Sequence, residues 1–352
     1  MKVNFISLGI ILVLSIFLAS CNTQQQTSTP NQNETTQQEK VETLKIYTTL
    51  YPLEDFAKKI GGEYVEVESV MPPGADAHTF EPTTKQMMSI AEADAFIYNG
   101  LGMEPFAEKM AETLRNEKVK MVEATHDIET IVHNEAHAHR EEQHSDEAHA
   151  HEEEQHSDEA HAHGEEQHSE SDPHGHNHGD FDPHVWLDPY RSITLAENIK
   201  NTLVELKPDA KEEFEKKYES LKAELQKLDE EFHRLADSKE NPEMIVSHAA
   251  YGYWEEVYGI HQIPVTGLSP SDEPSQKDLE EIIQMANEKQ IKYILFEQNV
   301  TPKVAEIVQN EINAEPLYLH NLESLTEKDR QNKEDYFSLM RKNLEALDKA
   351  LK

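Results

Sequence analysis

Short apolar runs alternate with amphipathic stretches over the first third of the chain. The runs are rich in β-branched and aromatic residues, which indicates buried strands, whereas the stretches between them repeat apolar residues at spacings of three and four, which indicates helices. The predicted strands span 44–50, 64–71, 95–100 and 118–124, and the predicted helices span 51–62, 84–92 and 105–116. This alternation predicts a parallel sheet with helices on its faces.

The middle of the chain has no strand pattern. One amphipathic helix is predicted over 193–207, and Pro208 opens a second, highly charged helix that continues to about Ala236. The second helix is much longer than an average helix in a globular protein. It is expected either to connect two lobes or to pack along the surface of one lobe.

The alternation returns after Asn241-Pro242 and predicts a second lobe of the same α/β type. Its predicted strands span 243–248, 264–269, 293–298 and 316–320, and its helices span 251–259, 275–289, 302–310 and a terminal stretch from Lys333. Ligands of open parallel sheets bind beyond the carboxyl ends of the strands. Two facing lobes would therefore place a site in the cleft between them.

The amino-terminal segment has the pattern of a lipoprotein signal. Lys2 is followed by an apolar stretch over 6–17, and Leu18-Ala19-Ser20-Cys21 matches the bacterial lipobox. Cys21 is the only cysteine, so a disulfide framework is excluded and lipidation of Cys21 is expected. The alternative is an ordinary signal peptide with a stray cysteine. The Gln-, Thr- and Asn-rich stretch that follows predicts a flexible tether.

These patterns divide the chain into five expected parts. They are a signal peptide (1–20), a lipidated cysteine with its tether (21–42), an N-terminal α/β lobe (43–206), a linking helix (207–238) and a C-terminal α/β lobe (239–352).

A histidine-rich repeat interrupts the first lobe at 133–178. A twelve-residue unit occurs three times in succession, and the segment contains thirteen of the twenty histidines, with almost no apolar residue larger than alanine. Such a segment cannot bury a core and is expected to form a disordered loop. Imidazoles among carboxylates suit weak binding of transition metals. The candidate accessory ligands are His137, His139, His144, His149, His151, His156, His161, His163, His168, His174, His176 and His178.

Charge restricts the class of partner. The formal net charge is −37, which argues against nucleic acid as a partner. The repeat contributes fourteen acidic residues and one arginine, so most of the excess belongs to the remainder of the chain. An acidic surface there is explained by solubility.

Four residues outside the repeat follow predicted strands or turns in corresponding places. His78 lies after the strand over 64–71, His184 follows the repeat, His248 ends the strand over 243–248, and Glu323 lies after the last strand. A single histidine at a strand end is more often a hydrogen-bonded structural residue than a ligand. Four such positions, two in each lobe, indicate a metal site.

The sequence resembles a known family in these same segments. The lipobox and the motifs PPGADAHTFEPT, DPHVWLDP, SHAAYGY, LSPSDEPS and LHNLESLT are similar to those of the zinc-specific solute-binding lipoproteins of bacterial ABC importers, the ZnuA-like and AdcA-like group of cluster A-I. The resemblance implies two α/β lobes joined by one long rigid helix, with one metal in the cleft. It implies His78, His184, His248 and Glu323 as metal ligands, although Asn321 stands where proline is usual.

The third ligand distinguishes the metals. Manganese-binding relatives carry a glutamate where this chain has His248, and three imidazoles with one carboxylate suit tetrahedral Zn²⁺ better than oxygen-loving Mn²⁺. Affinity alone would also admit Cu²⁺ and Ni²⁺. Glu297 resembles a glutamate that recurs in the family and is expected either to accept a proton from a ligating imidazole or to be a surface carboxylate.

The expected function is capture of extracellular Zn²⁺ and its delivery to an ABC permease by a monomer anchored to the cell membrane through lipid, in a Gram-positive bacterium. The alternatives are a manganese-binding, adhesin-like lipoprotein and a zinc-dependent enzyme with Glu323 as general base. No HExxH motif supports catalysis. The repeat is expected to collect zinc near the site; a pH or zinc sensor and a linker without a kinetic role are the alternatives.

Overall fold

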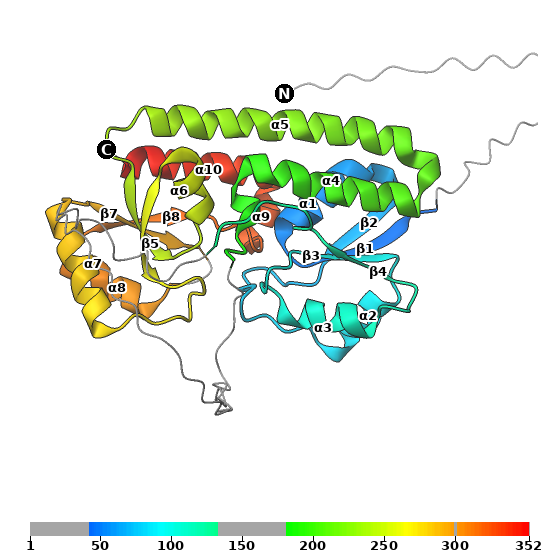
Figure 1. The fold of residues 1–352 in the computed structure, drawn as a ribbon, viewed down its shortest axis with the longest axis horizontal. Helices are drawn as coiled ribbons and strands as arrows, with labels where there is room; N and C mark the ends of the chain where they lie inside the picture. Colours follow the sequence, from blue (N-terminus) through cyan, green and yellow to red (C-terminus); the bar gives the residue numbers. More distant parts are fainter. Residues whose placement is uncertain (1–41, 133–180, 299–300, 352) are drawn as a thin grey trace, which may run out of the picture. The chain divides into compact units, whose positions relative to one another are not determined.

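Two four-stranded sheets organise the protein (Figure 1). The structure is a computed structural model that describes residues 42–132, 181–298 and 301–351, all within one compact unit, Val41–Lys352. The predicted signal peptide, Cys21, the tether and the histidine-rich repeat lie outside the described residues.

The first sheet consists of β1 (Leu44–Thr48), β2 (Val65–Ser69), β3 (Ala95–Tyr98) and β4 (Lys120–Glu123) in the order β2-β1-β3-β4, and every pairing is parallel. Helix α1 (Tyr51–Gly61) lies on one face, and α2 (Thr84–Ala91) and α3 (Pro105–Thr113) lie on the other (Figure 1). The predicted end of α1 is confirmed: the helix ends at Gly61, and Gly62 after it adopts φ 56°, which favours glycine.

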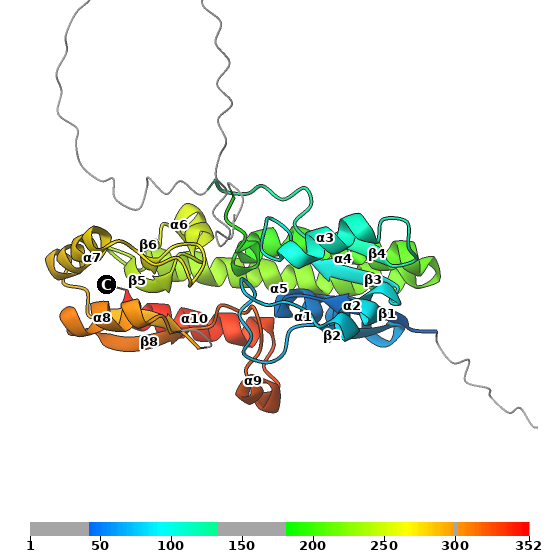
Figure 2. The ribbon, with the colours of Figure 1, turned by 90° about the horizontal axis from the view of Figure 1, so that it is seen from below.

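Two helices follow the first sheet. Helix α4 (Pro189–Leu206) packs on α1, and a short 3-10 turn leads into the 27-residue helix α5 (Lys211–Asp237). Helix α5 contacts α1 and α4 of the first lobe as well as α6 and α10 of the second (Figure 2). Its buried residues recur at helical spacing and include Phe214, Leu221 and Leu228. The prediction of one long helix connecting two lobes is therefore confirmed.

The second sheet repeats the first arrangement. Strands β5 (Glu243–His248), β6 (His261–Thr266), β7 (Tyr293–Glu297) and β8 (Glu315–Leu319) are parallel in the order β6-β5-β7-β8. The accompanying helices are α6 (Gly252–Tyr258), α7 (Gln276–Glu288), α8 (Lys303–Glu311), α9 (Glu327–Asn332) and α10 (Tyr336–Ala350).

The second sheet lies between two hydrophobic cores, because alternate side chains of its strands point to opposite faces. On β5, Met244 and Val246 join the large core that continues through α5 and the first lobe, whereas Ile245 joins a smaller core with residues of α7 and α8. Side chains of a strand point alternately to the two faces, so each face is covered by its own helices. The large core spans both lobes, which ties them into one unit.

Three predicted boundaries were wrong, each for a local reason. Strand β6 begins at His261, three residues earlier than predicted, and includes Pro264. It is an edge strand, where proline is tolerated because the missing N–H would face away from the sheet. Helix α4 begins at Pro189, because Asp188 caps it by accepting a hydrogen bond from the Tyr190 N–H at 2.9 Å.

The third error concerns the carboxyl-terminal helix. Lys333 is the left-handed residue that ends the unpredicted helix α9, and α10 starts only at Tyr336, after the capping residue Asp335. Helix α9 itself begins with a capping box between Thr326 and Asp329.

Candidate metal site

The strand order determines where the site residues meet. In each sheet the second strand along the chain pairs with one side of the first strand, and the third strand pairs with its other side. The strand order therefore reverses between β1 and β3 in the first sheet and between β5 and β7 in the second. Such a switch point leaves a crevice at the carboxyl ends of the strands. His248 and Glu297 are the last residues of the neighbouring strands β5 and β7, and Glu323 follows β8.

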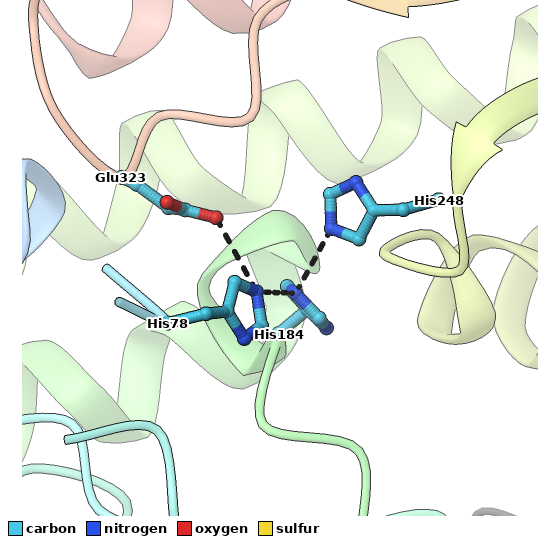
Figure 3. A group of neighbouring side chains, drawn as sticks. All are labelled: His78, His184, His248 and Glu323. Atoms are coloured by element: carbon cyan, nitrogen blue, oxygen red, sulfur yellow. Dashed lines mark hydrogen bonds and ion pairs between the residues drawn. The ribbon is translucent and has the colours of Figure 1, made fainter. Parts of the chain in front are cut away.

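Four predicted ligand positions come together in one buried group (Figure 3). His78, His184, His248 and Glu323 are each at most 3% exposed, and one ligand atom from each lies within 4.8 Å of the others. The Nε2 atom of His184 lies 3.3 Å from Nε2 of His78 and 3.4 Å from Nε2 of His248. The Nε2 atom of His78 lies 3.7 Å from Oε1 of Glu323.

The two distances between imidazole nitrogens match those around a tetrahedral ion. Zinc bonded to nitrogen at about 2.0–2.1 Å holds neighbouring ligand nitrogens about 3.3–3.4 Å apart, the edge of the corresponding tetrahedron. Two imidazole lone pairs that face each other at such a distance repel unless a proton or a cation lies between them. The donor set and its spacing therefore fit Zn²⁺.

Asp182 orients His184. Its Oδ1 accepts hydrogen bonds from the backbone N–H of His184 at 2.9 Å and from the ring at Nδ1 at 2.7 Å. The ring proton is thereby held at Nδ1, and the lone pair of Nε2 faces the other ligands. Asp182 was not predicted, although the spacing Asp-Pro-His in the motif DPHVWLDP is the signal that would have indicated it.

A second buried carboxylate, that of Glu297, faces the ring of His248. Its Oε1 lies 2.5 Å from Nδ1 of His248, and both residues are about 1% exposed or less. Burial, the largest influence, lowers the pKa of His248, but the charge of Glu297 and its hydrogen bond outweigh burial, so the pKa is raised. The expectation of a surface carboxylate at Glu297 does not hold.

Glu323 contributes a carboxylate between the lobes. Its Oε2 accepts a hydrogen bond from the backbone N–H of Ala77 at 2.8 Å, beside His78. Burial raises the pKa of Glu323 well above its ordinary value, the nearby negative charges of Asp76 and Glu297 raise it further, and the Ala77 bond opposes them. A cation in the site would favour the charged carboxylate.

The other described histidines do not join the group. His126, His233 and His261 are exposed or partly exposed. His320 is buried, accepts a hydrogen bond at Nδ1 from the Leu322 N–H at 2.9 Å, and faces Asp329 at Nε2 at 3.2 Å. Its position supports the loop that carries Glu323.

The chain is similar to known zinc-binding proteins over most of its length. The family model described as "Zinc-uptake complex component A periplasmic" matches residues 46–350. The chain is 34% identical over 346 residues to the zinc-binding lipoprotein AdcA of Streptococcus pneumoniae, a match that covers 97% of this chain and 60% of that protein. It thus spans less than two thirds of the length of the AdcA relatives that it matches.

Two further similarities cover nearly the whole relative. The chain is 33% identical to the high-affinity zinc uptake system protein ZnuA of Bacillus subtilis, over 88% of each chain. The crystal structure of the Zn(II)-bound ZnuA-like domain of S. pneumoniae AdcA matches with a TM-score of 0.67 and 32% identity, covering 88% of this chain and 99% of that one. The family is a component of zinc uptake, a solute-binding role and not an enzymatic one. The chain belongs to this ZnuA family of zinc-uptake components.

Proposed function

We propose that this protein captures Zn²⁺ outside the cytoplasmic membrane and delivers it to the permease of an ABC importer. The observation that carries the proposal is the convergence of three imidazoles and the carboxylate of Glu323, with Nε2 of His184 3.3 Å from that of His78 and 3.4 Å from that of His248. Four protein ligands complete the coordination of zinc, whereas hydrolytic zinc sites keep a position open for water. Binding and transfer therefore explain the site better than catalysis.

Zinc is favoured over manganese by His248. The His248→Glu variant would convert the donor set to two imidazoles and two carboxylates, which suits Mn²⁺. We expect it to lower the ratio of Zn²⁺ to Mn²⁺ affinity by at least about tenfold, measured by competition between the two ions. His261→Glu, the same change at an exposed position of β6, is the control and should leave the ratio unchanged. An unchanged ratio in His248→Glu would contradict the assignment of His248 as a ligand.

The histidine-rich segment 133–178 is proposed to collect zinc for this site. It lies outside the described residues, but the residues on either side of it are described: Val132 and Phe181 form an antiparallel bridge, and Asp182, which holds His184, donates its N–H to the Ile131 carbonyl at 3.0 Å. The segment is therefore attached directly beside a predicted ligand. Multiple weak sites there would raise the local zinc concentration.

Deletion of 133–178 tests both parts of the proposal. We expect one tightly bound zinc to remain in the shortened protein, measured as metal content after dialysis, and its capture of zinc at low concentration to be slower. A full-length variant with the repeat histidines changed to glutamine separates loss of imidazoles from loss of length. Loss of the tight zinc would refute the cleft site, and an unchanged capture rate would refute the collector.

The amino-terminal segment is proposed to anchor the protein as a monomeric lipoprotein, with the five-part division of the chain given above. The support is the lipobox ending at Cys21 and the lipoprotein name of the AdcA relative. No helix in the described part of the chain is long and apolar enough to cross a membrane. Release of the Cys21→Ser variant from membranes, with wild type retained, would support the lipid anchor.

A further inference from the structure

We propose that Asn321 is a positioning residue that sets His248 and Glu323 relative to each other through its side-chain amide. The inference rests on the proposed zinc site and adds a determinant of its geometry. Asn321 is 4% exposed and lies two residues before Glu323 in the loop after β8.

The amide of Asn321 uses both of its ends. Its Nδ2 donates a hydrogen bond to Oε2 of Glu297 at 2.9 Å, and its Oδ1 accepts one from the backbone N–H of Glu323 at 3.2 Å. The other oxygen of Glu297 faces Nδ1 of His248. One side chain thus links the carboxylate that orients His248 to the backbone that carries Glu323.

The side-chain amide of Asn321 matches the chemistry of its two partners. A carboxylate accepts hydrogen bonds and a backbone N–H donates them, so a residue between them must supply one donor and one acceptor. Asparagine does this in one orientation only. Aspartate would place a second carboxylate against Glu297, and an apolar residue would leave a buried donor and a buried acceptor without this partner.

The backbone around Asn321 extends the link to a third ligand. The Asn321 carbonyl accepts a hydrogen bond from Nε1 of Trp186 at 2.7 Å, and the Trp186 ring lies against the ring of His184, with centroids 5.3 Å apart. The next residue, Leu322, has φ 60°, which is uncommon for a residue other than glycine. Such conformations persist where the surroundings hold them and are concentrated at functional sites.

A polarity swap tests the proposal. In Asn321→Asp the donor to Glu297 is lost, and in Glu297→Gln two amide donors face each other; we expect each change to weaken zinc binding about 10–100-fold. In the double variant, the amide introduced at position 297 donates to the carboxylate introduced at position 321, while the new amide carbonyl still accepts from His248. The hydrogen bond is restored with reversed direction, so zinc affinity should recover by at least about tenfold from either single variant.

The measurement is zinc affinity by competition with a chromophoric chelator, together with the visible spectrum of bound Co²⁺, which reports coordination geometry. Asn198→Ala is the control. Asn198, like Asn321, uses its side-chain amide in hydrogen bonds, in this case to the Ala124 and His126 carbonyls, but it lies on α4 and does not contact Glu297. It should leave both readouts unchanged. If Asn321→Asp does not fold, Asn321→Ala replaces it, and its loss of affinity must be smaller when Glu297 is already glutamine.

The outcomes separate this inference from the proposed function. Wild-type protein that binds no tight zinc would contradict the proposed function itself. Wild-type binding with unaffected single variants, or with losses that simply add in the double variant, would overturn the role of Asn321 alone. Recovery in the double variant, with the Co²⁺ spectrum of wild type, would establish it.

Discussion

Two buried carboxylates set the chemistry of the histidines in the candidate site. Asp182 accepts from Nδ1 of His184 and Glu297 faces Nδ1 of His248, so each ring presents Nε2 to the centre. Neutral imidazole with a free lone pair is the form that binds a metal. The carboxylates thereby orient the two rings with Nε2 toward the centre, where a cation would bind.

Another buried carboxylate, Glu104, lies at the switch point of the first sheet. It accepts hydrogen bonds from the hydroxyl of Thr49 and from the backbone N–H groups of Asn99 and Gly100. Burial raises the pKa of Glu104 to about 7, and these hydrogen bonds only partly oppose the shift. Its protonation therefore contributes to stability in mildly acidic solution.

The raised pKa of Glu104 should be visible in how the free energy of unfolding depends on pH. Below the ordinary glutamate pKa both folded and unfolded states are protonated, and as pH rises toward 7 the unfolded state loses its proton first. The folded state is therefore destabilised by about 3 kcal/mol between about pH 4 and pH 9. We expect the unfolding free energy of wild type, measured in urea without metal, to fall by this amount relative to Glu104→Gln. A difference independent of pH would contradict the raised pKa.

At the scale of elements, α5 joins the lobes because of its apolar face. Leu225, Leu228 and Phe232 are fully buried in the large core, although the helix as a whole is highly charged. Side chains at spacings of three and four share one face of a helix, so a single line of residues contacts both lobes. The charged residues occupy the solvent side.

Truncating this apolar face should destabilise the fold without altering the site. Leu228→Ala leaves a cavity in the core and should lower the unfolding free energy by about 2–5 kcal/mol. The control is Lys227→Ala at the adjacent, exposed position, which should change the unfolding free energy by no more than about 0.5 kcal/mol. Denaturant unfolding measures both, and one tight zinc per folded molecule is expected in each. Equal effects of the two substitutions would show that α5 does not pack as described.

The loop after β8 shows what element prediction misses. Its capping signals, Thr326 with Asp329 and Asp335 with Ser338, are present in the sequence but are short and polar. They produce α9 and the start of α10, and Asp329 then contacts His320 beneath the site. Hydrophobic periodicity alone does not detect such a short helix.

At the scale of the whole molecule, the site joins the two lobes. The backbone N–H of Tyr51 donates to the Glu323 carbonyl at 3.0 Å, and the Ser324 hydroxyl donates to the Ala75 carbonyl at 2.7 Å. His78 and Glu323 come from opposite lobes, and their nearest side-chain nitrogen and oxygen are 3.7 Å apart. A bound ion would add a further link between the lobes.

Zinc should therefore stabilise the molecule through residues of both lobes. For protein lacking 133–178, free zinc at about 100 times its Kd should add about 2.7 kcal/mol and raise the melting temperature. His78→Ala in the first lobe and His248→Ala in the second should each abolish the increase, measured by scanning calorimetry. An increase that survived either substitution would place the zinc elsewhere.

Much of the architecture follows from the sequence. The alternation of apolar runs and amphipathic helices predicted two parallel α/β lobes and the long helix between them. Such a prediction is possible because a buried strand leaves a short apolar run in the sequence, whereas a helix with one buried face repeats apolar residues at spacings of three and four. The same pattern placed His248 and Glu297 at strand ends. The assignment of His78, His184, His248 and Glu323 as ligands stays a prediction, and their arrival in one group agrees with it.

The tertiary structure alone decided the distances and the supporting contacts. The amide of Asn321 and the N–H of Ala77 serve the site through hydrogen bonds to residues brought together by folding. Nothing in the local pattern distinguishes a buried asparagine that links two carboxylate-bearing segments from an ordinary loop asparagine. Periodicity reports which face of an element is buried, whereas hydrogen-bond partners depend on how the two lobes pack against each other.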